Sequence, residues 1–164
     1  MKRALGVDVG GVIIDTSDGG IENPFFGEDG FVQARVHYFA FSVLKDLNVL
    51  FHGQVYVVSK CHSRMERKIC AWMEVHDFSR RTGIPFDHIY FCKERNEKAP
   101  LCLNLEISDF VDDHLDVLHY LHSVPYKYLF QGHPDDIEEY QNLLPFVHHV
   151  HNWLELGQQL HRSF

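Results

Sequence analysis

Short apolar runs recur along this chain, and each ends at a polar or charged residue. They are rich in Val, Ile, Tyr and Phe, as buried strands are. The runs cover residues 4–7, 54–58, 88–92, 110–111 and 126–130. Longer stretches with room for helices separate them. The pattern therefore predicts βαβ units: an α/β fold of three layers, with a mostly parallel central sheet covered on both faces.

Helical spacing of apolar residues fills the stretches between these runs. Residues 31–47 carry apolar side chains near the i, i+3, i+4, i+7 spacing of an amphipathic helix. Residues 63–82 form a second candidate, which ends at Gly83 and Pro85 in the usual stop pattern. Shorter helices are expected at residues 100–107, 115–123 and 134–142.

The chain has 164 residues, enough for one domain with its own core, so residues 1–164 are expected to form a single domain. Residues 15–30 are rich in Gly, Asp, Asn and Pro, which predicts an irregular flap after the first strand. There is no apolar stretch of membrane-spanning length and no signal-peptide pattern, so a cytoplasmic protein without a membrane partner is expected.

The net charge and the spacing of the cysteines and histidines argue against nucleic-acid binding and against a zinc site. The formal net charge is −8, which makes a nucleic-acid partner unlikely because such partners attract basic surfaces. The four cysteines show no zinc spacing and are expected to be reduced thiols. The histidines at 148, 149 and 151 have no carboxylate or cysteine at ligand spacing, so a solvated or partly buried edge is expected there.

Polar residues follow the predicted strands at the edge where parallel sheets bind ligands. They are Asp8, Ser59, Lys93, Asp112 and Asp113. Mg²⁺ takes carboxylates together with carbonyls, waters and substrate oxygens, and it neutralises a phosphate that a carboxylate is to attack. A hydroxyl and a lysine would hold the phosphoryl oxygens. These residue types predict a phosphoryl-transfer site.

Structural roles compete at each position. Asp8 could cap a turn made by Gly10 and Gly11, and Ser59 could be the N-cap of the helix that follows. Asp112 and Asp113 could be a solvated pair in a loop, although adjacent carboxylates directly after a buried strand are costly without a cation.

Four segments together resemble the haloacid-dehalogenase-like (HAD) superfamily of phosphohydrolases. Asp8-Val-Gly-Gly-Val-Ile-Ile-Asp-Thr is similar to the first motif of that family, and Val-Tyr-Val-Val-Ser59 to the second. Glu-Lys98-Ala-Pro is similar to the third motif, and Phe-Val-Asp112-Asp113 to the fourth. They occur in the family's order, between residue 4 and about residue 120.

The resemblance implies a three-layer, Rossmann-like α/β core and a Mg²⁺-dependent phosphatase that forms an aspartyl-phosphate on Asp8. Asp8, the carbonyl of Gly10, Asp112 and Asp113 would hold the metal. Ser59, Lys60 and Lys98 would bind the phosphoryl group, and the Lys-Ala-Pro context favours Lys98 over Lys93 for the cationic clamp.

Two features qualify the resemblance. Phosphatases of the family usually carry an aspartate two residues after the nucleophile as general acid and base, and this chain has Gly10 there. The alternative is therefore a catalytically weakened HAD-fold protein that binds a phosphorylated ligand or a protein partner. The intervals from Asp8 to Ser59 and from Ser59 to Lys98 leave no room for a separate cap domain. An open site of this kind suits a large, macromolecular phosphorylated substrate, or a lid from a second copy in a homo-oligomer.

Overall fold

A single six-stranded sheet forms the centre of the molecule, and all of its strand pairings are parallel. The computed structural model describes residues 3–17 and 31–164. The strands are β1 (Leu5–Val7), β2 (Val55–Lys60), β3 (Ile89–Cys92), β4 (Asp109–Asp112), β5 (Tyr126–Phe130) and β6 (His148–Val150). Their order, β3-β2-β1-β4-β5-β6, is that of doubly wound, Rossmann-like sheets. The prediction of an α/β fold with a parallel sheet is confirmed.

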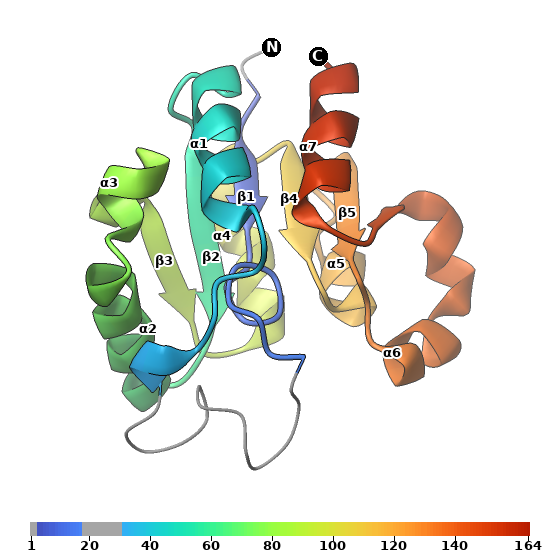
Figure 1. Ribbon diagram of the computed structural model, residues 1–164. Coiled ribbons are helices and arrows are strands. Elements are labelled where there is room, and N and C mark those ends of the chain that lie inside the picture. The colour runs from blue at the N-terminus through green and yellow to red at the C-terminus, as the bar shows by residue number, and fades with distance from the viewer. Residues whose placement is uncertain (1–2, 18–30) are drawn as a thin grey trace.

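Helices cover both faces of the sheet, which gives three layers (Figure 1). One face packs against α1 (Ala40–Leu50), α2 (Ser63–Val75), α3 (Phe78–Thr82) and α7 (Trp153–Arg162). The other packs against α4 (Lys98–Asn104) and α5 (Leu115–Tyr120), with α6 (Pro134–Glu139) at its margin. Short 3-10 turns complete the described elements: η1 (Phe31–Gln33), η2 (Phe86–His88), η3 (Arg95–Glu97) and η4 (Gln141–Phe146).

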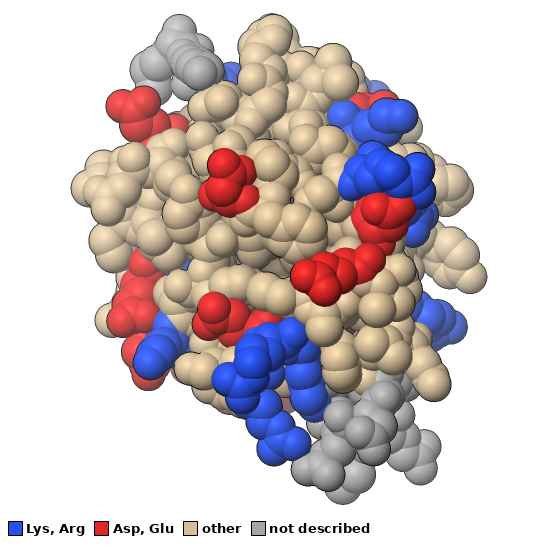
Figure 2. Space-filling model, turned by 90° about the vertical axis from the view of Figure 1, so that its left-hand side faces the viewer, with Lys and Arg blue, Asp and Glu red and all other residues tan. Residues whose placement is uncertain are grey.

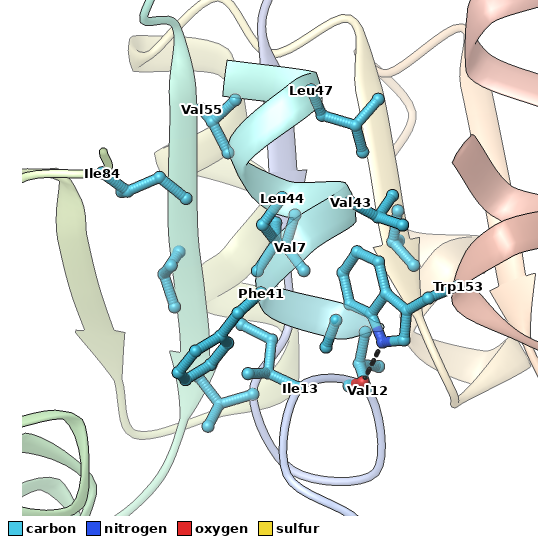
Figure 3. Packing of buried hydrophobic residues seen from close by; sticks show 14 of the residues in the cluster. Val7, Val12, Ile13, Phe41, Val43, Leu44, Leu47, Val55, Ile84 and Trp153 are labelled. Carbon is cyan, nitrogen blue, oxygen red and sulfur yellow. Dashed lines mark hydrogen bonds between the residues drawn. The ribbon is translucent and has the colours of Figure 1, made fainter. Parts of the chain in front are cut away.

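The larger core lies between the sheet and α1. Successive strand side chains point to opposite faces, so Val55 and Val57 belong to this core while Val58 belongs to the core on the other face. Figure 3 shows the apolar side of α1 against the sheet, with the ring of Trp153 beside it. The Trp153 indole N–H donates to the Val12 carbonyl at 2.8 Å. This bond ties α7 to the loop that follows β1.

Two of the predicted helices are wrong in extent. The helix expected at residues 31–47 begins only at Ala40, because the backbone before it pairs with the loop after β1: Asp15 N–H donates to the Arg35 carbonyl, and His37 N–H to that of Ile13. The helix expected at residues 63–82 is divided into α2 and α3. Asp77 takes a left-handed conformation (φ 57°), which no α-helix continues through.

The C-terminal part of the chain adds two elements that the sequence patterns did not predict. β6 is a sixth, edge strand of three residues, on which His148 and His149 are exposed. α7 begins at Asn152, whose side chain accepts from the Glu155 N–H, and it buries Trp153 and Leu160. Most of the expected flap, residues 18–30, lies outside the described residues. None of the described helices is long and apolar enough to cross a membrane.

Candidate functional site

Three carboxylates meet where β1 and β4 lie side by side at the carboxyl edge of the sheet. Asp8 directly follows β1, Asp112 ends β4, and Asp113 follows it. The Asp8 N–H donates to the Val111 carbonyl at 3.0 Å, which continues the pairing of the two strands. One carboxylate oxygen from each of the three residues lies within 4.8 Å of the other two. This edge is the point at which the strand order reverses, the usual ligand position in such sheets.

Lys98 joins two of these carboxylates. Its ammonium Nζ donates to Asp8 Oδ1 at 2.8 Å and to Asp112 Oδ2 at 2.7 Å, and its side chain is only 2% exposed. Lys98 begins α4, which follows η3, and a capping box between Glu94 and Glu97 fixes that turn. Lys93 is exposed and does not line the pocket described below. Of the two lysines considered, Lys98 is therefore the one beside the carboxylates.

Burial dominates the ionisation of this cluster. It raises the pKa of Asp8 to about 7 and that of Asp112 to about 6, against the opposing effect of the Lys98 charge. Burial also lowers the pKa of Lys98, but Asp112 and Asp8 outweigh it and leave that pKa above its ordinary value. Lys98 is therefore charged at neutral pH, and both carboxyl groups take up protons more readily than exposed ones do.

The two carboxylate oxygens of Asp113 lie in different environments. Its Oδ2 lies 2.7 Å from Nε2 of His133, whereas its Oδ1 is buried without a hydrogen-bond partner. Gly11 makes room for this carboxylate: its φ is +77°, and a Cβ there would lie 2.1 Å from Asp113 Oδ2. Position 11 therefore has to be glycine for the Asp113 carboxylate to lie where it does.

A pocket of about 260 Å³ opens onto the cluster. All of the residues predicted for the site line it: Asp8, Gly10, Ser59, Lys60, Lys98, Asp112 and Asp113. Ser59 is buried at the end of β2, and Lys60 is exposed beside it. Cys61 also lines the pocket, where burial raises the pKa of its thiol to about 12 and so keeps it protonated. All four cysteines are free, as expected.

The sequence reasoning missed four polar residues of the pocket wall: Thr16, Arg95, His114 and His133. His114 directly follows the acidic pair, and its N–H donates to Asp112 Oδ1 at 3.0 Å. His133 comes three residues after β5 ends. Extending the strand-end rule to the loop after the fifth predicted strand would have identified His133.

Gly10 lies in the pocket wall, and a Cβ at this position would meet nothing within 4 Å. Asp15 and Asp18 are the next carboxylates after Gly10 in the sequence. Asp15 does not replace the missing acid: it accepts from Ser17 and lies 3.8 Å from Arg35. Asp18 lies outside the described residues. Among the described residues that line the pocket, the only carboxylates are those of the cluster itself.

Charge is unevenly spread on the surface beside the site. Figure 2 shows the side of the molecule that carries β3, α2 and α3, where Lys and Arg side chains gather in separate groups, with acidic and uncharged side chains between them. The sequence of α2 itself contains Arg64, Arg67 and Lys68. This face therefore carries local positive groups although the chain as a whole is acidic.

A scan against protein-family models finds no match to this chain, and a search among curated proteins finds none either.

Proposed function

We propose that this protein is a Mg²⁺-dependent phosphohydrolase that acts through Asp8. The observation that carries the proposal is the buried cluster of Asp8, Asp112, Asp113 and Lys98 in the wall of a pocket. Three buried carboxylates with a single bonded cation among them are costly, and Asp113 Oδ1 has no hydrogen-bond partner at all. A hard divalent cation would compensate the carboxylate charges and would also bind the Asp113 oxygen that has no hydrogen-bond partner.

The donor set fits Mg²⁺ in kind. Oxygen ligands from Asp8, Asp112, Asp113 and the Gly10 carbonyl are the type that Mg²⁺ prefers, and the pocket leaves room for water and substrate oxygens. When bound, the ion would neutralise negative charge on the phosphate and so permit attack by a carboxylate.

Asp8 has one oxygen held and one left for chemistry. Lys98 fixes Oδ1, which leaves Oδ2 to attack phosphorus. The new Oδ2–P bond forms as the bond from phosphorus to the leaving oxygen breaks, and this gives an aspartyl-phosphate. Water then cleaves that acyl phosphate, releases inorganic phosphate and restores the Asp8 carboxylate. Throughout, Lys98 orients Asp8 and supplies positive charge next to the reacting group.

Ser59 and Lys60 would contact the phosphoryl group from the neighbouring strand. Ser59 is buried in the pocket wall, so its hydroxyl can donate to a phosphoryl oxygen bound in the pocket. Lys60 is exposed in the same wall and would attract the anionic substrate.

The proposal includes membership of the HAD-like superfamily without a separate cap. It rests on the four ordered motifs and on a Rossmann-like sheet that brings their key residues to one edge. The described elements between Asp8 and Lys98 are η1, α1, β2, α2, α3, η2, β3 and η3. These elements belong to the sheet and to its covering helices, and none of them forms a separate cap domain over the pocket. Because a pocket without a cap is open to large ligands, we propose a large phosphorylated substrate.

Hydrolysis of p-nitrophenyl phosphate tests the proposal. The wild type should turn over this easy leaving group with Mg²⁺ and not after chelation. Asp8→Asn should abolish turnover, whereas Asp46→Asn, an exposed position on α1, should leave it unchanged. Equal rates for the wild type and Asp8→Asn would exclude Asp8 as the nucleophile.

Gly10 supports a second candidate: a HAD-fold protein that binds a phosphorylated ligand or partner with little turnover. General acid–base help is worth about 10²–10⁴-fold, and the described residues that line the pocket include no carboxylate outside the cluster that could supply it. Saturable, Mg²⁺-dependent binding of a phosphate mimic without hydrolysis would favour this candidate over the enzyme.

A further inference from the structure

Two histidines form one wall of the pocket, next to the carboxylate cluster and outside the set proposed for Mg²⁺. The imidazoles of His114 and His133 stack with their centroids 4.2 Å apart and their planes 18° from parallel. Both residues line the pocket. Neither has a role in the phosphohydrolase proposal.

The backbone is strained where it delivers His133. Gln131 and Gly132, which directly follow β5, are both left-handed, with φ of 58° and 82°. A non-glycine residue in this region is uncommon and costs about 1–3 kcal/mol, a cost typical of functional loops. Gly132 is also sterically fixed, since a Cβ there would lie 2.7 Å from Ile137 Cδ1. This turn brings His133 back onto the edge of the sheet, within 2.7 Å of Asp113.

The donor atoms converge as metal ligands do. One ligand atom each from Asp113, His114 and His133 lies within 4.8 Å of the other two. Asp113 is 5% exposed, and its Oδ1 has no hydrogen-bond partner. This second oxygen is therefore available to bind a metal ion even when Oδ2 contacts His133. Two imidazoles and a carboxylate suit a first-row transition ion such as Zn²⁺, whereas Mg²⁺ prefers oxygen ligands alone.

Charge around the histidines also favours a cation. Asp116 and Asp136 each offer a carboxylate oxygen within 4.8 Å of a ring nitrogen of His114. Together with Asp8, Asp112 and Asp113 they place five carboxyl groups around this part of the pocket. Among the described residues, Lys98 bonds to Asp8 and Asp112, and Arg95 bonds to Asp116.

We propose that Asp113, His114 and His133 form a second metal site, selective for a transition ion such as Zn²⁺, with Asp113 shared between it and the Mg²⁺ site. The ion would lie in the pocket wall, where it can attract an anionic ligand. The proposal does not depend on phosphatase activity, because metal binding is measured without turnover.

Zn²⁺ binding in excess Mg²⁺, followed by calorimetry, tests the site. The wild type should bind one Zn²⁺ per chain. His133→Gln and His114→Gln should each weaken binding at least ~10-fold, since even outer partners of metal ligands are worth that much. His161→Gln, an exposed position on α7, is the matched control and should bind as the wild type does. Asp8→Asn should retain the Zn²⁺ while losing turnover, which separates this proposal from the phosphohydrolase.

A spectroscopic measurement on the wild type alone tests the site even if the variants fail to fold. Co²⁺, used in place of Zn²⁺, should give a visible absorption band typical of imidazole and carboxylate ligands, and Zn²⁺ should displace it. The proposal is overturned if the wild type binds no Zn²⁺ in excess Mg²⁺, or if His133→Gln folds and binds it equally well. It is also overturned if the Zn²⁺ is lost instead from a His149→Gln, His151→Gln variant, since these two rings lie 4.5 Å apart and are not among the residues that line the pocket.

Discussion

Lys98 and Asp8 form a buried ion pair, with the ammonium Nζ 2.8 Å from the carboxylate Oδ1. The same ammonium reaches Asp112 Oδ2 at 2.7 Å, so a single lysine links the ends of β1 and β4. Removing one partner from a buried pair leaves an uncompensated charge, which is far more costly than losing a surface ion pair. Lys98 therefore supports both the stability of this edge and the orientation of the proposed nucleophile.

Lys98→Met keeps the length of the side chain and removes its charge. The Lys98 charge lowers the pKa of both Asp8 and Asp112, so without it the two buried carboxylates either stay ionised with no cation beside them or must take up protons to fold. We expect a loss of about 3–5 kcal/mol in the free energy of unfolding, measured by urea denaturation without metal. Lys93→Met, at an exposed position, should change it by less than about 0.5 kcal/mol. Similar losses in the two variants would contradict a structural role for the Lys98 pair.

The strand-end rule explains how far the sequence predicted the site. Asp8, Ser59 and Asp112 follow or end apolar runs, and parallel strands bring such ends to one edge, so local patterns were sufficient to place them together. Lys98 begins a helix and reaches the edge with a long side chain. It was identified only through the Lys-Ala-Pro context of the family resemblance.

Tertiary contacts decide what the sequence did not reveal. Val36 fits a helical pattern, yet its backbone forms an antiparallel bridge with Ile14, so this stretch is extended. Asp77 adopts a left-handed conformation and so interrupts an apparently continuous helix, although no glycine in the sequence marks this position. His133 depends on a turn made by Gln131, a residue that rarely adopts such a conformation. Each of these conformations depends on packing that no short window of sequence contains.

Gly11 and Gly53 form a matched pair for a test of the site's packing. Both have φ of +77°, so an alanine at either position is strained by its backbone alone. A Cβ at Gly53 meets nothing within 4 Å, whereas one at Gly11 would lie 2.1 Å from Asp113 Oδ2. We expect Gly11→Ala to cost roughly 1–3 kcal/mol more than Gly53→Ala in urea denaturation. It should also weaken Mg²⁺ binding by at least ~10-fold, measured by calorimetry, while Gly53→Ala leaves binding unchanged. Equal effects would mean that Asp113 can shift without consequence.

His37 should make the fold sensitive to acid. Burial lowers the pKa of this imidazole below its ordinary value of 6.5, and its Nε2 lies 3.1 Å from the Gly11 carbonyl. The unfolded chain therefore takes up a proton near pH 6.5 that the folded state resists, so stability from this group is lost as the pH falls below that value. The stability advantage of the wild type over His37→Gln should shrink between pH 7 and pH 5 in urea denaturation. The exposed control His161→Gln should show no such trend, and a constant advantage for His37 would contradict the assignment.

Gly10→Asp tests whether the missing acid limits hydrolysis. The change is structurally open, because a Cβ at Gly10 meets nothing within 4 Å and its φ lies outside the left-handed range. An acid there could protonate the leaving oxygen and then accept a proton from the attacking water, help that is worth about 10²–10⁴-fold when fully realised. Because p-nitrophenolate leaves without a proton, the gain should be concentrated on alkyl phosphates. We expect the ratio of kcat/KM for glycerol phosphate to that for p-nitrophenyl phosphate to rise at least ~10-fold. Gly10→Asn has the same size without the acid and should leave this ratio unchanged. A rise with Asn as large as with Asp would assign the effect to packing, and no rise with Asp would mean that another group already supplies the proton.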